Sequence, residues 1–261
     1  MTTKDTLGDR IKNDYENRTR YMLPRRTYTF IRVDGKSFHT YTRNCTRPYD
    51  INLMDDMDAT AAGLCAELGG ALIAFVQSDE ISVLLTDFEN EQTEAWFDGN
   101  LQKMASISSS VATAYFNEAR RSRGHESMAF FDSRVFTVPD PIEVENYFIW
   151  RQQDASRNSI SMTAQAHFPH ERLQGIGTNQ LQEMLFTEAG VNWNDQPAGF
   201  KRGRCVVRAA VSQDKVFFDK RTGHEEIARG IVRHEWQVVE PPIFTQDREW
   251  LRSRIPRIAH Q

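Results

Sequence analysis

Hydrophobic residues recur with two different periods along the first half of the chain, and this pattern predicts both strands and helices. Residues 27–33 mix β-branched and aromatic side chains, which is typical of a strand. Apolar residues at helical spacing predict a helix over residues 53–68. Two uninterrupted apolar runs, 71–76 and 81–85, are typical of buried strands. The first predicted elements are therefore a strand, a helix and a pair of strands, in that order.

The polar stretch 77–80 between those two runs predicts the tip of a hairpin. A broad apolar face then predicts a long helix over about 91–119, and residues 128–139 predict a fourth strand. The resulting strand–helix–strand–strand–helix–strand order is the ferredoxin-like arrangement, an α+β fold. Its right-handed crossover leaves the first two strands parallel. We therefore expect Asp34, at the end of the first strand, and Asp79, at the hairpin tip, to lie at one edge of the sheet.

The pattern changes beyond residue 140. Residues 144–168 predict a helix with many polar groups between aromatic ones, and residues 204–212 and 230–239 predict two more strands. We expect a boundary near residue 140. A first domain would cover 1–140, and a second α+β domain over 141–261 would pack on it and share its core.

The composition of the 261 residues is that of an ordinary globular protein, with 39% hydrophobic and 26% charged residues. No apolar run approaches the roughly 20 residues that span a bilayer, so we expect a soluble, cytoplasmic protein without a membrane partner. The cysteines have neither a disulfide nor a zinc pattern; they are Cys45, Cys65 and Cys205. A net charge of −4 excludes a uniformly basic surface but leaves local basic patches for a single RNA end.

The dipeptide Asp34-Gly35 has two interpretations. Asp-Gly is among the commonest turn pairs, because glycine accepts positive φ and aspartate bonds to its own backbone. A phosphate-binding P-loop is excluded, because it needs a second glycine at the position of Phe30. The other interpretation is a metal site, in which Asp34 and Asp79 hold a pair of Mg²⁺ ions together with phosphates and water. Such a site would suit nucleotidyl transfer, which depends on positioning and charge neutralisation.

Several longer segments occur together in a familiar order. They read IRVDGKSFH, VQSDEISVLL, FDSRVFTVP, YFIWRQQD and LQEMLFTEAGVNWND followed by FKRGRCVVR. In order and spacing they resemble the tRNA(His) guanylyltransferase family, including its guanylyltransferase-like, bacterial and phage branch. The resemblance covers residues 5–210 and implies a fold similar to a polymerase palm in the first domain, with a C-terminal domain of the family's type. It also implies a Mg²⁺-dependent nucleotidyltransferase that extends the 5′ end of tRNA in the 3′-to-5′ direction with GTP or other NTPs, uses ATP or GTP for activation, and forms a homotetramer.

The resemblance also implies roles for individual residues. Asp34, the Gly35 carbonyl and Asp79 would bind two Mg²⁺ ions, the two aspartates being catalytic. The nucleoside triphosphate would lie against those residues and Lys36, Ser37, Phe38, His39 and Ser78. Further possible contacts with RNA or triphosphate are Glu80, Lys103, Arg151, Asn158, Lys201 and Arg202. Other interpretations stay open: a core role for Phe38, a structural hydrogen bond for His39, a hairpin-edge charge for Glu80 and a plain surface position for Lys103.

The chain departs from the family at two places. Members that act on tRNA(His) carry His-Ile-Asn-Asn-Leu-Tyr-Asn-Thr where residues 156–163 read SRNSISMT, so only Asn158 and Thr163 are kept. A family lysine is replaced by Leu181. These departures favour the branch associated with template-dependent repair of truncated tRNA 5′ ends. Two other functions remain open, a palm-type nucleotide cyclase or signalling-nucleotide synthase and a non-catalytic RNA-binding protein.

Overall fold

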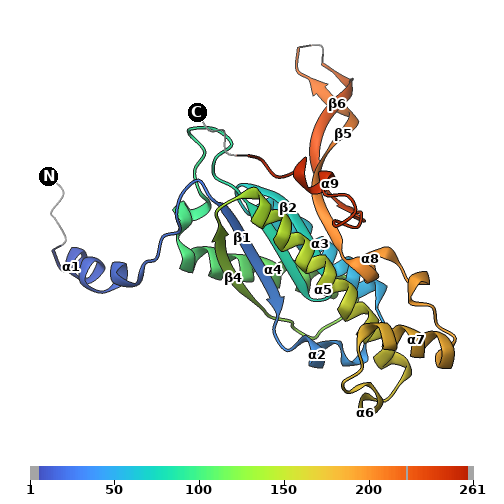
Figure 1. Cartoon of the computed structure of the whole chain (residues 1–261). Coiled ribbons are helices and arrows are strands. Elements are labelled where there is room, and N and C mark those ends of the chain that lie inside the picture. The colour runs from blue at the N-terminus through green and yellow to red at the C-terminus, as the bar shows by residue number, and fades with distance from the viewer. Residues whose placement is uncertain (1–5, 222, 258–261) are drawn as a thin grey trace.

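A six-stranded antiparallel sheet forms the centre of the computed structural model, which describes residues 6–221 and 223–257 (Figure 1). The strands are β1 Tyr28–Gly35, β2 Ala71–Gln77, β3 Glu80–Leu85, β4 Phe131–Val138, β5 Arg204–Asp219 and β6 His224–Val239. They lie in the order β4-β1-β3-β2-β5-β6, and each pairs antiparallel with its neighbours. Because β3 lies between β1 and β2, those two strands run in the same direction, and both end at the same edge of the sheet.

Long helices cover both faces of this sheet. The helices α3 Ile51–Glu67 and α4 Leu101–Ser122 pack on one face, and α5 Pro141–His167 crosses the other (Figure 1). Shorter helices surround them: α1 Thr6–Asp14, α2 Phe38–Tyr41, α6 His170–Leu173, α7 Thr178–Ala189, α8 Ala198–Arg202 and α9 Glu249–Arg252. Since both faces are covered, the central strands are apolar on both sides. This is why β2 and β3 appeared in the sequence as continuous hydrophobic runs.

Side chains alternate between the two faces along each strand. On β1, Ile31 and Val33 join the core under α3 and α4, whereas Tyr28 and Phe30 join the core under α5. The α5 core also contains Cys205 of β5 and residues near the C-terminus. The first and second halves of the chain therefore share one core, and β5 extends the sheet by pairing with β2. The division into two domains at residue 140 stays a prediction.

The structure agrees with the predicted α+β class and with the predicted element order from β1 to β4. The start of the second long helix was predicted wrongly, because α4 begins at Leu101 and not near residue 91. Residues Trp96–Gly99 form a 3₁₀ turn in which Phe97 and Asp98 have φ of 50° and 54°. Asn100 then caps α4 by accepting a hydrogen bond from the Lys103 amide at 3.1 Å. A polar cap after a left-handed turn starts the helix there, although the apolar pattern extends further back.

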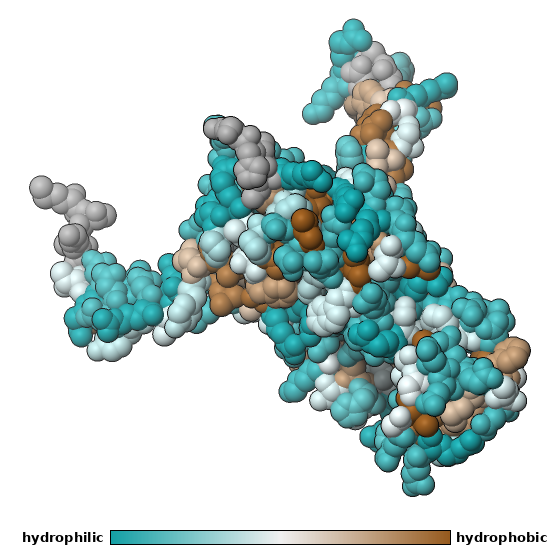
Figure 2. All heavy atoms as spheres, in the orientation of Figure 1, coloured by the Kyte–Doolittle hydropathy of each residue, from teal (hydrophilic) through white to brown (hydrophobic). Residues whose placement is uncertain are grey.

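Two segments project from the body of the protein. The β5–β6 hairpin is longer than its predicted strands and extends beyond the sheet, and α1 lies away from the sheet (Figure 1). Figure 2 shows hydrophobic side chains along the projecting hairpin. The exposed ones include Val216, Phe217, Phe218, Ile227 and Val232. Within the described ranges, no helix combines the length and hydrophobicity needed to cross a membrane.

Candidate active site

A row of four polar residues crosses the α5 face of the sheet at the edge where β1 and β2 end. Strand register places Asp132 of β4 beside Asp34 of β1, Asp34 beside Glu80 of β3, and Glu80 beside Gln77 of β2. The hairpin tip that joins β2 and β3 is only Ser78-Asp79, shorter than predicted. The Gly35 amide donates to the Asp79 carbonyl at 3.1 Å. The predicted convergence of Asp34 and Asp79 is therefore present in the structure.

The two aspartates lie together without a cationic side chain between them. Neither Asp34 nor Asp79 forms an ion pair with any residue that the structure describes. Burial raises the pKa of Asp79, and repulsion from the Asp34 carboxylate adds to that shift, against hydrogen bonds from the backbone and Ser78. Two close carboxylates with no counter-charge favour binding of a cation.

Glu80 has the opposite environment, because arginines surround its carboxylate. Arg151 Nε lies 2.8 Å from Oε1 and its Nη2 donates to Oε2 at 2.8 Å, while Arg32 Nε lies 3.5 Å from Oε2. Glu80 and Arg151 are only 9% and 4% exposed. Burial raises the pKa of Glu80, and both arginines oppose that shift. The Glu80–Arg151 pair is thus a buried structural contact. Either residue could contact RNA or triphosphate, as predicted, only if this ion pair opened.

Gly35 and Ser37, which has a left-handed conformation, determine the path of the segment after β1. A Cβ at Gly35 would overlap the Phe38 ring, which is 5% exposed and lies 5.2 Å from the Phe131 ring between centroids. Ser37 has φ of 56° and ψ of 36°, a left-handed conformation that turns the chain into α2. Phe38 is therefore a core anchor. Its polar neighbours Ser37 and His39 face a groove of about 530 Å³ that also reaches Asp79.

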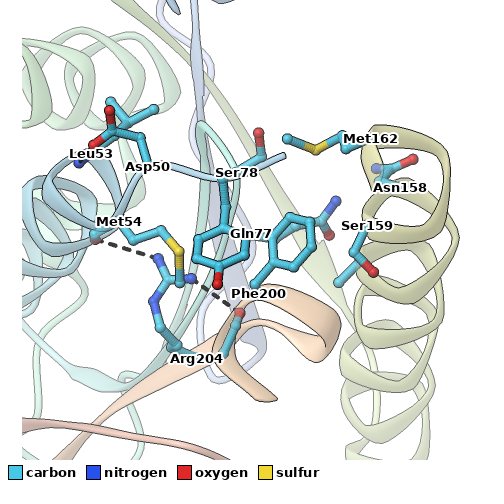
Figure 3. A pocket seen from close by; sticks show the side chains of 13 residues that line it. Asp50, Leu53, Met54, Gln77, Ser78, Asn158, Ser159, Met162, Phe200 and Arg204 are labelled. Carbon is cyan, nitrogen blue, oxygen red and sulfur yellow. Dashed lines mark hydrogen bonds between the residues drawn. The ribbon is translucent and has the colours of Figure 1, made fainter. Parts of the chain in front are cut away.

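Three hollows meet at Ser78 and Met162. The first is the groove of about 530 Å³ just described, which contains Arg47 as its cationic residue. The second is a groove of about 340 Å³ lined by Asp34, Asp79 and residues of α5. The third is a narrower cavity of about 60 Å³ between α3, β2, α5 and α8 (Figure 3). Because they share these two lining residues, the three hollows adjoin one another at this edge of the sheet.

The structure places the other predicted contact residues in different positions. Asn158 is exposed and lines both the 340 Å³ groove and the narrow cavity. Lys201 is buried, donates to the Asn194 carbonyl and lies over the Trp193 ring, whereas Arg202 beside it is half-buried. Lys36 is exposed and is not among the residues that line the grooves.

Lys103 lies at the opposite end of α4 from the site. The end of α4 near the site is marked by Asn117, whose side chain bonds to the backbone of Ala129 just before β4. The start of β4, Phe131, pairs with Gly35. Lys103 precedes Asn117 by four turns of helix, or about 20 Å. Within one chain, Lys103 is therefore an exposed helix residue remote from Asp34 and Asp79.

Several residues of the site were not predicted from the sequence. Arg47 and Met162 line the grooves, and Gln77 lines both the narrow cavity and the groove that contains Asp34. Arg47 stands alone in an irregular loop, so no periodic pattern marks it. Gln77 was assigned to the hairpin tip, although it is the last paired residue of β2. Its polar side chain at the end of a buried strand was the signal that was available.

The residues present suit a magnesium site. No group of three or more histidine, cysteine, aspartate or glutamate side chains is arranged around a common point in the described part of the chain. Mg²⁺, however, is commonly bound by one or two carboxylates together with substrate phosphates and water. Asp34 and Asp79 provide two such oxygen ligands without a competing cation. The fit rests on these two oxygen ligands and on the repulsion between the two carboxylates, which a bound cation would relieve.

The family comparisons cover most of the chain. Residues 8–139 match the family model described as tRNAHis guanylyltransferase, and residues 142–241 match the one described as Thg1 C terminal domain. The tRNA(His) guanylyltransferase of Eremothecium gossypii is 31% identical over 72% of this chain and 84% of its own.

Solved structures with bound nucleotides are also similar. A bacterial tRNA(His) guanylyltransferase (Thg1)-like protein in complex with ATP is 42% identical, with a TM-score of 0.83 over 96% of this chain and 99% of that one. A structure of the same description in complex with GTP is 41% identical, with a TM-score of 0.77 over 95% and 98%.

Proposed function

Because the chain belongs to the tRNAHis guanylyltransferase family, we propose that it adds guanosine or templated nucleotides to the 5′ end of tRNA, in the 3′-to-5′ direction and with Mg²⁺. Guanylyl transfer to tRNA is a nucleotidyl transfer, so the chain is a nucleotidyltransferase. GTP and other nucleoside triphosphates would be its substrates, since its structural relatives are described as complexes with ATP and GTP.

The observation that carries this proposal is the meeting of Asp34 and Asp79 beside two open grooves. Their carboxylates have no cationic partner among the described residues, and they adjoin grooves of about 340 and 530 Å³. Asp34 and Asp79 would hold two Mg²⁺ ions, which neutralise charge on the attacking and leaving oxygens when bound. Arg47 and the hydroxyls of Ser37 and Ser78 lie where they would contact the triphosphate.

The proposed reaction joins an incoming nucleotide to an RNA 5′ triphosphate. The 3′-hydroxyl oxygen of the nucleotide forms a bond to the α-phosphorus of the RNA end, the bond from that phosphorus to the β-phosphate oxygen breaks, and pyrophosphate leaves. The hydroxyl proton passes to solvent. The chain's contribution is to align the two ends, because phosphoryl transfer depends on positioning more than on covalent help.

We propose that the substrate is a truncated tRNA in general, in addition to any action on tRNA(His). Two observations support this: the departures over residues 156–163 and the higher identity to the bacterial protein than to the fungal enzyme, 42% against 31%. Leu181, at the position of the family lysine, is 5% exposed and packs with Ile160 and Leu185. A homotetramer in the cytoplasm is part of the proposal, and the exposed β5–β6 hairpin offers apolar surface for such an assembly.

The test uses a 5′-triphosphorylated tRNA that lacks its first nucleotide, incubated with labelled GTP and Mg²⁺. We expect the wild type to extend this RNA by one nucleotide, and we expect Asp79→Asn to lose at least about 1,000-fold in rate. The control is Asp132→Asn, which removes the same charge from an exposed residue beside Asp34 and should cost less than tenfold. No extension by the wild type, or full activity of Asp79→Asn, would refute the proposal. Product made without RNA would instead indicate a cyclase.

A further inference from the structure

Arg120 of α4 is a buried cation that joins separate parts of the fold. The residue is 4% exposed. Its Nη1 donates to the Asp56 carboxylate of α3 at 3.0 Å, and its Nε donates to the Tyr41 hydroxyl at the end of α2 at 3.4 Å. The guanidinium carbon lies 6.0 Å from the centre of the Tyr41 ring. A buried charge is costly unless it is paired and hydrogen-bonded, so Arg120 restrains the elements that supply its partners.

Neutralising Asp56 does not depend on Arg120 alone, because Arg123 contacts the same carboxylate. Arg123 Nε donates to Asp56 Oδ1 at 2.8 Å, and its Nη1 donates to the Asn52 side chain, also on α3, at 2.9 Å. Both arginines therefore attach α4 to α3. Of the two, Arg120 is the one that also reaches α2.

The loop over residues 42–50, which follows α2, is held mainly by local hydrogen bonds. Those that its backbone and hydroxyl groups make with described residues stay between Phe38 and Met54. Side chains must therefore attach this loop to the rest of the fold. At one end of the loop the Tyr49 ring lies 4.7 Å from the Phe200 ring, between centroids. At the other end the attachment is the contact of α2 with α4.

The charge of Arg120 also acts on the carboxylate that closes this loop. Asp50 accepts hydrogen bonds from the Leu53 amide at 3.0 Å and from the Thr46 amide at 3.1 Å. Burial opposes ionisation of Asp50, but these two amides and the positive charge of Arg120 outweigh it and lower the pKa of Asp50. Arg120 thus favours the ionised form, which accepts both bonds.

The same loop forms one wall of the candidate site. Thr42 and Arg47 line the groove of about 530 Å³ that reaches Asp79. Arg47 is the cationic residue of that groove, and a guanidinium bonds to a phosphate oxygen at about 2.8 Å. A small displacement of the loop would therefore remove Arg47 from a bound triphosphate.

We propose that Arg120 is a positioning residue for the nucleoside triphosphate, and that it acts by holding the loop over residues 42–50 so that Arg47 faces the groove. This inference rests on the proposed nucleotidyltransferase function. Arg120 is not among the residues that line the three hollows, so it acts through the loop and not by touching the nucleotide.

Three variants separate this role from a purely structural one. Arg120→Met removes the contacts with Asp56 and Tyr41. The matched control is Arg123→Met, which removes the other arginine from the same carboxylate and the same helix end but leaves the contact between α4 and α2. Arg47→Met removes the proposed triphosphate contact itself.

The experiment measures equilibrium binding of GTP in the presence of Mg²⁺, together with kcat for extension of the truncated tRNA at saturating GTP. We expect Arg120→Met to raise the Kd for GTP at least about tenfold and to change kcat less than about threefold. Arg123→Met should change the Kd less than about twofold. In the Arg47→Met background, Arg120→Met should raise the Kd by less than about threefold more, because the contact through which it acts is already absent.

The outcomes distinguish this inference from the proposed function. If the wild type binds GTP, an unchanged Kd in Arg120→Met, or an equal rise in Arg123→Met, would overturn the role of Arg120 and leave nucleotidyl transfer intact. A full tenfold rise in the Arg47→Met background would overturn action through Arg47. Absence of GTP binding by the wild type would overturn the proposed function itself.

Urea unfolding followed by far-UV circular dichroism identifies a variant that fails to fold. If Arg120→Met does so, Arg120→Lys replaces it. A lysine keeps the charge, but its compact ammonium group does not reproduce the planar fork that contacts Asp56 and Tyr41 together. Arg120→Lys should raise the Kd for GTP at least about threefold, and an unchanged Kd in this variant would overturn the inference.

Discussion

Breaking the buried Glu80–Arg151 pair should destabilise the protein far more than breaking an ion pair on its surface. Glu80→Gln removes the negative charge and leaves Arg151, whose side chain is 5% exposed, with Asp154 at 3.1 Å as its one carboxylate partner among the described residues. Arg151→Met leaves Glu80 with Arg32 at 3.5 Å. In both single variants a buried charge loses most of its compensation.

The expected magnitude follows from this geometry. Removing one member of a buried ion pair costs about 3–5 kcal/mol, and the remaining partners, Asp154 and Arg32, place each variant near the lower limit. The double variant Glu80→Gln with Arg151→Met leaves neither of the two charges, so it should be more stable than the sum of the single changes implies. We expect a coupling free energy of about 2 kcal/mol or more.

The assay is urea unfolding followed by far-UV circular dichroism for the wild type, both single variants and the double variant. The exposed pair Arg172 and Glu188 is the matched control: its Nη2–Oε2 distance is 2.9 Å, but the side chains are 50% and 44% exposed. Its coupling should be at most about 1 kcal/mol. Additive losses for Glu80 and Arg151, within about 0.5 kcal/mol, would refute the reasoning. Retention of Mg²⁺-dependent stabilisation in Glu80→Gln would separate Glu80 from the metal ligands.

Three further predictions concern other residues. Gly35→Ala should lower the free energy of unfolding in urea by about 1–3 kcal/mol, because the added Cβ overlaps the Phe38 ring. Phe38→Leu in the same chain should recover part of that loss, and an unchanged unfolding midpoint in Gly35→Ala would contradict the overlap. Ser37→Gly should stabilise the protein by about 1 kcal/mol in the same assay, since its left-handed conformation is strained for a residue with a side chain; a loss of stability would argue against strain. Burial raises the pKa of Cys65 to about 12, so at pH 8 a disulfide reagent should react with Cys45 first and with Cys65 only after urea unfolding, and equal rates in the folded protein would contradict this.

The element order was predictable from the hydrophobic periodicity, and the meeting of Asp34 with Asp79 then follows from topology. Two strands joined by a right-handed crossover end at the same edge, wherever the helices between them begin. The identity of Glu80 as a buried ion-pair partner was not predictable in this way. Its partner Arg151 lies 71 residues away on α5, and that contact depends on how α5 packs across the sheet.

Helix boundaries and the position of Lys103 show a second limit of sequence reasoning. Apolar residues continue before α4, so periodicity alone places the start of the helix near residue 91. The left-handed turn and the Asn100 cap make the helix begin at Leu101 instead. Lys103 was assigned by resemblance, and a resemblance carries no information on which end of a helix faces the site. Gln77 Oε1 is buried without a hydrogen-bond partner among the described residues, and this is visible only when every neighbouring donor has been placed.

The charges at the site end of the sheet explain why a cation and a triphosphate would bind there as a unit. Arg32 and Arg151 neutralise Glu80, but they leave Asp34 and Asp79 without an ion-pair partner among the described residues. A free triphosphate would be repelled by those carboxylates, and two carboxylates alone hold Mg²⁺ weakly, because the ion keeps most of its water. Each ligand supplies the charge that the other lacks. Since such coupling is reciprocal, we expect Mg²⁺ to raise nucleotide affinity by the same factor by which nucleotide raises Mg²⁺ affinity.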